Sequence, residues 1–143
     1  MERLRLELDL LKKALKTLED SFGVLEDAKK LEHAGLILAA EDSIIQRFEY
    51  TSESFWKFLK KYLETIHHLV DISSSRKALY ASVKHEICTT DEGTVFLDMV
   101  DDRNETSHTY SIEESRIILV DIPRYYSVMA TVTTRLEEAL HRG

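Results

Sequence analysis

The residues best suited to chemistry form one short segment, Arg103-Asn104-Glu105-Thr106-Ser107-His108, followed by Thr109 and Tyr110. Arginine supplies a permanent cation, asparagine a neutral amide, and histidine a group that titrates near neutral pH. Together these groups can move protons around a phosphodiester without a metal. The segment is therefore the first candidate for an active site.

The directions of these side chains matter if the segment continues as one regular helix. At about 100° per residue, Asn104 and His108 lie one turn apart on the same face. Arg103 and His108 then point roughly 140° apart. To hold one phosphate together, the helix must end or bend there, or two copies of the chain must face each other. A symmetric dimer supplies the second copy, so we link activity to a homodimer.

The reaction that suits these groups is RNA cleavage through the 2′-hydroxyl. His108 can act as a general base or acid, and Arg103 can stabilise the charge on the phosphorane. Asn104 can support them by orienting the phosphate or fixing the imidazole tautomer. The alternative is structural: a polar helix end in which Arg103 forms surface salt bridges with Asp98 and Asp102. Residue types alone leave both interpretations open.

Size and charge narrow the class of protein. The 143 residues predict a single domain, residues 1–143, and the formal charge of −7 argues against a surface that wraps long nucleic acid. We therefore expect no DNA, and only a small or locally bound RNA such as tRNA. No stretch approaches the ~20 apolar residues of a membrane span. The single cysteine, Cys88, fits a reducing cytoplasm and a packing role. No cluster with ligand spacing suggests a metal or a cofactor.

One proline and four glycines favour long helices over strands and turns. The first expected helix carries a heptad-like leucine seam and ends near Ala34-Gly35, where Gly35 supplies a left-handed cap. The second expected helix runs from about Asp42 to His68. The seam of the first helix consists of Leu4, Leu8, Leu11, Leu15, Leu18, Phe22 and Leu25.

Three further helices follow, each with a start signal. The serines at 73–75 can cap a short helix that runs to about Glu86. Thr89 with Glu92 and Ser111 with Glu114 are capping boxes that open the last two helices, and Pro123 predicts a kink in the final one. The expected fold class is all-α: an up-and-down four-helix bundle with an additional short helix.

Two further segments join the candidate site in a recognisable pattern. These are Phe48-Glu49-Tyr50-Thr51 with Trp56-Lys57 and Leu59-Lys60, and then residues 97–104 with Ser107-His108-Thr109-Tyr110. Together they resemble the HEPN domain family, in the branch described as nucleotidyltransferase substrate-binding proteins, which includes HepT-type toxins. The resemblance covers residues 5 to 140, and its most specific element is the spacing of Arg103, His108 and Tyr110.

The resemblance implies a HEPN-like helical bundle that dimerises and brings two such motifs into one cleft. Many members are metal-independent ribonucleases, which implies active roles for Arg103 and His108. In HepT-type systems a cognate minimal nucleotidyltransferase acts as antitoxin by adenylylating the motif tyrosine, which corresponds to Tyr110. Added phosphates would bring negative charge to a site built for phosphate. We interpret Trp56 as core or dimer packing, and Arg47 and Lys57 as weaker candidates for the cleft.

Three functions therefore remain open at this point. The first is a toxin-like ribonuclease of a toxin–antitoxin pair. The second is a non-catalytic nucleotide- or substrate-binding subunit of a two-component nucleotidyltransferase, which the acidic charge favours. The third is a helical dimer whose motif is inactive, because a fold carries many functions.

Overall fold

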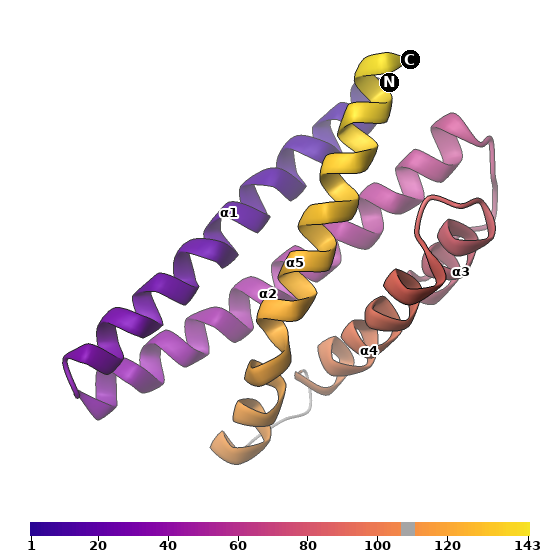
Figure 1. Cartoon of the computed structure of the whole chain (residues 1–143). Coiled ribbons are helices and arrows are strands. Elements are labelled where there is room, and N and C mark those ends of the chain that lie inside the picture. The colour runs from indigo at the N-terminus through magenta and orange to yellow at the C-terminus, as the bar shows by residue number, and fades with distance from the viewer. Residues whose placement is uncertain (107–110) are drawn as a thin grey trace.

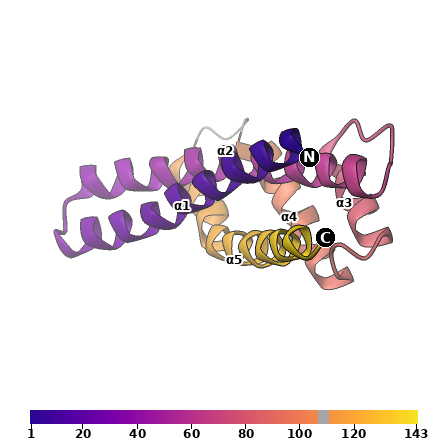
Figure 2. The same cartoon turned by 90° about the horizontal axis from the view of Figure 1, so that it is seen from above.

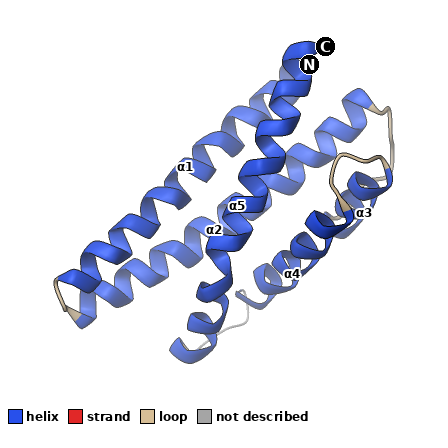
Figure 3. Ribbon diagram, viewed as in Figure 1, coloured by secondary structure: helices blue, strands red, loops and turns tan. Residues whose placement is uncertain are grey.

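The computed structural model describes residues 1–106 and 111–143, and these form five helices. Figure 3 shows only helices and connecting loops in this described part of the chain. Four helices are long and one is short, so the predicted all-helical bundle with an additional short helix is confirmed. The helices are α1 (Glu2–Lys30), α2 (Ala34–Ile66), α3 (Ser75–Lys84), α4 (Thr90–Thr106) and α5 (Ile112–Arg142).

Helices α1 and α2 form a long antiparallel hairpin that extends beyond the other helices at its turn (Figures 1 and 2). The leucine seam of α1 faces the core as predicted. The five leucines of the seam are buried, and Phe22 and Leu25 are partly buried. A row of large side chains from α2 covers this seam, because their helical spacing places them on one face. They include Phe48, Phe55, Phe58, Leu59 and Leu63.

The predicted cap at Gly35 is wrong, and so is the start of α2 near Asp42. Helix α2 already begins at Ala34, which places Gly35 in its first turn. The left-handed residue of the connection is Glu32, with φ of 53°. His33 then caps α2, since its Nδ1 accepts a hydrogen bond from the backbone N–H of Leu36 at 3.1 Å. A histidine N-cap is not among the usual start signals, which is why the pattern placed the boundary too late.

The predicted caps of the remaining helices are confirmed. Ser74 caps α3 through the backbone N–H of Lys77 at 3.2 Å, and Ser111 caps α5 through that of Glu114 at 3.0 Å. At the start of α4 the exchange between Thr89 and Glu92 is reciprocal, with donor–acceptor distances of 2.9 and 3.1 Å. These bonds satisfy backbone donors that the first turn of a helix leaves without partners.

Helix α5 packs across the hairpin and also contacts α4, so it joins the two halves of the core. It continues through Pro123, and Figure 2 shows a change of direction in its orange, N-terminal part. Aromatic pairs link the helices: Phe48 of α2 stacks with Tyr125 of α5 at 5.7 Å, and Phe55 lies 4.7 Å from Phe96 of α4. In the described residues no helix is long and apolar enough to cross a membrane.

Candidate functional site

Arg103 and Asn104 lie near the end of α4 and line one pocket of about 280 Å³. Three helices contribute to its wall, which is therefore held by the packing of α2, α3 and α4 against one another. Two of the predicted site residues, which are neighbours in the sequence, therefore line a pocket at the surface. The lining residues are Ser52, Glu53, Trp56, Ser75, Leu79, Met99, Val100, Arg103 and Asn104.

Arg103 is partly buried and forms an ion pair across to α2. Its Nη1 lies 3.7 Å from Oε2 of Glu49, and the two side chains are 28% and 31% exposed. The hydroxyl of Thr106 donates to the carbonyl of Arg103 at 2.7 Å, which satisfies one of the acceptors at the helix end. An incoming anion therefore has to compete with the Glu49 carboxylate for this guanidinium.

The aspartates that were candidates for surface pairs with Arg103 have partners on α5. Asp98 lies 3.7 Å from Arg124, and Asp102 accepts a hydrogen bond from the hydroxyl of Tyr125. Burial raises the pKa of the Asp102 carboxyl above its ordinary value, while the bond from Tyr125 opposes that shift. Burial and the neighbouring carboxylate together raise the pKa of Tyr125. The end of α4 is therefore fixed to α5 by a half-buried bond one residue before Arg103.

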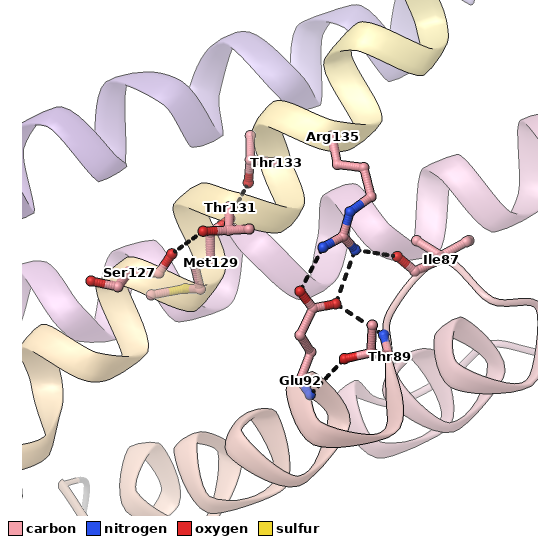
Figure 4. Close-up of polar contacts among 8 residues, drawn as sticks. All are labelled: Ile87, Thr89, Glu92, Ser127, Met129, Thr131, Thr133 and Arg135. Carbon is pink, nitrogen blue, oxygen red and sulfur yellow. Dashed lines mark hydrogen bonds and ion pairs between the residues drawn. The ribbon is translucent and has the colours of Figure 1, made fainter.

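A second anchor fixes the start of α4 to α5 (Figure 4). Two guanidinium nitrogens of Arg135 donate hydrogen bonds to the carboxylate of Glu92, at 2.9 and 2.6 Å. Arg135 also donates to the carbonyl oxygen of Ile87 at 3.0 Å. The pKa of Glu92 is lowered, and the hydrogen bond from Arg135 is the largest cause. With α4 attached at both ends, Arg103 is held by a rigid element, as precise binding of a phosphate requires.

His108 and Tyr110 lie outside the described residues, which are 1–106 and 111–143. The predicted roles of these two residues, and the predicted meeting of two motifs across a dimer axis, therefore stay predictions. Helix α4 is described as far as Thr106. The predicted geometry can be followed to Asn104, which is exposed one residue beyond Arg103.

Trp56 and Glu53 are site residues that the sequence interpretation missed. Trp56 is partly buried and lines the pocket, and its Nε1–H donates to Oε2 of Glu53 at 3.0 Å. Of the weaker candidates, Lys57 lies 3.5 Å from Glu53 and does not line this pocket, nor does Arg47. The spacing of glutamate three residues before tryptophan was the available signal, because it allows an indole N–H to be satisfied on one helix face.

Cys88, the single cysteine of the sequence, does not line this pocket. Cys88 is buried, and burial raises the pKa of its thiol to about 12, which agrees with the predicted packing role. Among residues 1–106 and 111–143, no three His, Cys, Asp or Glu side chains are grouped to hold a metal ion. The chemistry that the described site supports is the binding of an anion by Arg103 beside a partly apolar pocket.

Comparison with known proteins identifies the family. The family model described as nucleotidyltransferase substrate binding protein like matches residues 6–138. The chain belongs to this family. The resemblance to the HEPN family and its HepT branch is thereby confirmed. Among curated proteins, no sequence relative matches the chain.

Solved structures similar to this family member include one close in sequence and several close only in fold. A protein from Thermus thermophilus is 34% identical with a TM-score of 0.75, and the match covers 88% of this chain and 98% of that one. A chain of the toxin–antitoxin MntA–HpeT is 14% identical with a TM-score of 0.75, covering 96% and 99%. A tri-AMPylated Shewanella oneidensis HEPN toxin in complex with MNT antitoxin is 14% identical with a TM-score of 0.73, covering 94% and 96%. At 14% identity the likeness shows the fold.

Proposed function

We propose that this protein is the ribonuclease toxin of a toxin–antitoxin pair, metal-independent as the family resemblance implies. Two copies form a homodimer and pool Arg103 and His108 around one phosphodiester of a small RNA such as tRNA in the cytoplasm. The observation that carries this proposal is the place of Arg103 and Asn104 on a pocket wall in a member of this family. A guanidinium held there matches the oxygens of a phosphate.

The proposed cleavage is a transesterification. The 2′-oxygen of the ribose attacks phosphorus while the bond to the 5′-oxygen breaks, which leaves a 2′,3′-cyclic phosphate. His108 takes the proton of the 2′-hydroxyl or gives one to the leaving 5′-oxygen. Arg103 stabilises the extra negative charge of the phosphorane, and Asn104 orients the phosphate.

Control by a cognate minimal nucleotidyltransferase completes the proposal. The phenol oxygen of Tyr110 attacks the α-phosphorus of ATP, forms a phosphodiester with AMP and releases pyrophosphate. The resulting negative charge lies seven residues after Arg103 and competes with RNA for it. The Shewanella oneidensis HEPN toxin, which is similar in fold, is described as tri-AMPylated and in complex with MNT antitoxin. That description supports this form of control.

A second candidate is a non-catalytic subunit that binds a nucleotide or presents a substrate to a separate nucleotidyltransferase. The formal charge of −7 favours it, because docking to another protein needs no basic groove. The pocket beside Arg103 is compatible with this function as well, since it offers a cation for a phosphate beside a partly apolar hollow. The two candidates differ in whether RNA is cut.

Expression of the gene without a gene for the proposed nucleotidyltransferase tests the first candidate. We expect growth arrest that His108→Ala relieves, whereas His141→Ala, a histidine in the exposed last turn of α5, leaves it in place. Purified dimer incubated with total RNA in a chelator should yield fragments ending in a cyclic phosphate. Intact RNA with a folded, unmodified dimer would favour the binding subunit. Co-expression with the nucleotidyltransferase should add whole AMP units to Tyr110, seen by mass spectrometry and lost in Tyr110→Phe.

A further inference from the structure

The pocket beside Arg103 has two chemically different walls. On the α4 side, Arg103 and Asn104 offer a cation and an amide. On the α2 side, Trp56 and Glu53 offer an aromatic ring and a carboxylate. The volume of about 280 Å³ lies just below the range of about 300–1,000 Å³ that is usual for whole small-molecule sites. The pocket therefore suits one part of a larger ligand whose charged part lies at Arg103.

The α2 wall is arranged as a fixed unit. Nε1 of Trp56 donates to Oε2 of Glu53 at 3.0 Å, and the other oxygen of that carboxylate lies 3.5 Å from Nζ of Lys57. Both contacts are within one or two turns of the same helix, so the indole and the carboxylate keep their relative positions. A carboxylate has about four acceptor positions, and these two contacts leave capacity for a further donor.

A ring next to a phosphate-binding arginine is the arrangement by which single-stranded nucleic acid is held. Aromatic side chains stack on unpaired bases, while cationic groups contact the backbone. The formal net charge of −7 argues against a long basic track, so we expect binding of a single strand to depend on such local contacts. Trp56 is the only tryptophan of the chain, which gives this wall its own spectroscopic signal.

We propose that this pocket is a nucleobase subsite, in which Trp56 packs against the base next to the phosphate held by Arg103 and Glu53 accepts a hydrogen bond from the amino group of that base. This assignment rests on the proposed function for the identity of the substrate as RNA. Cytosine presents an amino donor at the position where uracil presents a carbonyl oxygen, and a carboxylate accepts only from the former. The subsite therefore prefers cytosine to uracil.

Oligonucleotides that cannot be cut test the subsite directly. Tetranucleotides of 2′-O-methylcytidine and 2′-O-methyluridine lack the attacking hydroxyl, and their binding is followed by the fluorescence of Trp56 in the full chain. We expect saturable quenching by the cytidine oligonucleotide and about 5- to 150-fold weaker binding of the uridine one. Glu53→Gln should bring the two affinities close together, since an amide can also donate to a uracil carbonyl.

A variant series identifies the ring. With a dye-labelled cytidine oligonucleotide and anisotropy, Trp56→Ala should weaken binding about 5- to 150-fold, the range for loss of one stacked base. Trp56→Phe keeps a ring in the core contact and should lose less. Tyr80→Ala removes an aromatic side chain from the exposed face of α3, outside the pocket, and should bind as the unaltered protein does.

The outcomes separate this subsite from the proposed ribonuclease. Absence of quenching by either oligonucleotide, or equal loss of binding in Tyr80→Ala and Trp56→Ala, would overturn the subsite. Equal affinities for cytidine and uridine in the unaltered protein would overturn the role of Glu53. Quenching with the cytidine preference but no cleavage of RNA would support the subsite and remove the ribonuclease. Cleavage without any quenching would do the reverse.

Discussion

Replacing Glu49 by glutamine removes the carboxylate that pairs with Arg103 while keeping nearly the same shape. The atoms involved are 3.7 Å apart. At that separation two unit charges attract by about 4.5 kcal/mol at an effective dielectric of about 20, and by about 1 kcal/mol in water. Both side chains are about a third exposed, at 28% and 31%, so the pair is closer to the aqueous limit. We take about 1 kcal/mol as the cost of breaking the contact between Glu49 and Arg103 when a phosphate approaches.

Glu49→Gln should therefore tighten the binding of RNA. A gain of about 1 kcal/mol corresponds to a roughly fivefold lower Kd, since about 1.4 kcal/mol is tenfold. The assay is anisotropy of a labelled 2′-O-methyl oligonucleotide at about 0.15 M salt, where the Debye length of about 8 Å suppresses distant charges. The gain should fall as salt is raised, because the Arg103–phosphate contact is itself electrostatic.

Glu64→Gln is the matched control for this experiment. It lies on the same helix, its side chain is 30% exposed and it pairs with Lys61 at 3.2 Å, so it changes the net charge equally without touching Arg103. We expect its Kd to stay near that of the unaltered protein. If Glu49→Gln binds no more tightly than Glu64→Gln, then Arg103 does not contact the phosphate, and the reasoning about the site is wrong.

Three further predictions concern two groups that attach α4 to α5 and the buried cysteine. The Arg135 contact lowers the folded-state pKa of Glu92, so the stability that this carboxylate adds is complete above the ordinary value of 4.5 and is lost as pH falls below it. Glu92→Gln should cost about 2 kcal/mol near pH 7, or about 4–8 °C in Tm, and urea unfolding should show that difference shrinking in acid. Burial raises the pKa of Asp102 in the folded state, so the folded protein favours the protonated carboxyl. The stability that this group adds is therefore present in acid and is lost as pH rises through the folded-state pKa. Tyr125→Phe removes the hydrogen bond to that carboxylate. It should lower the free energy of unfolding by about 1–3 kcal/mol at neutral pH and by less in acid, as measured by chemical unfolding. An equal loss at both pH values would contradict this. Cys88 is buried with a thiol pKa raised to about 12, so a disulfide reagent should modify it at the rate of unfolding, and rapid modification of the folded protein would show that the thiol is accessible.

Local patterns in the sequence predicted most of the helical elements. The capping boxes at Thr89 and Ser111 work through residues three positions apart, so they can be recognised without knowing the fold. The leucine seam of α1 likewise depends only on helical periodicity. The start of α2 was missed for the same kind of reason, because its cap at His33 uses a residue type that seldom signals a helix start.

Local patterns in the sequence also predicted part of the candidate site. The sequence by itself determined the residue types and the spacing around Arg103 and Asn104, which are local properties, and these predict phosphate binding. It also determined the family through the residues around that segment. The predicted helix faces could not say which distant side chains meet Arg103.

Only the tertiary structure decided that Glu49 pairs with Arg103, and that Trp56 lines the same pocket rather than serving packing alone. It also decided that Asp102 and Glu92 attach α4 to α5. These contacts join side chains on different helices, and their geometry depends on crossing angles and side-chain packing across the whole core. Periodicity specifies which face of a helix is buried, whereas the neighbour that covers this face is set by the packing of all five helices.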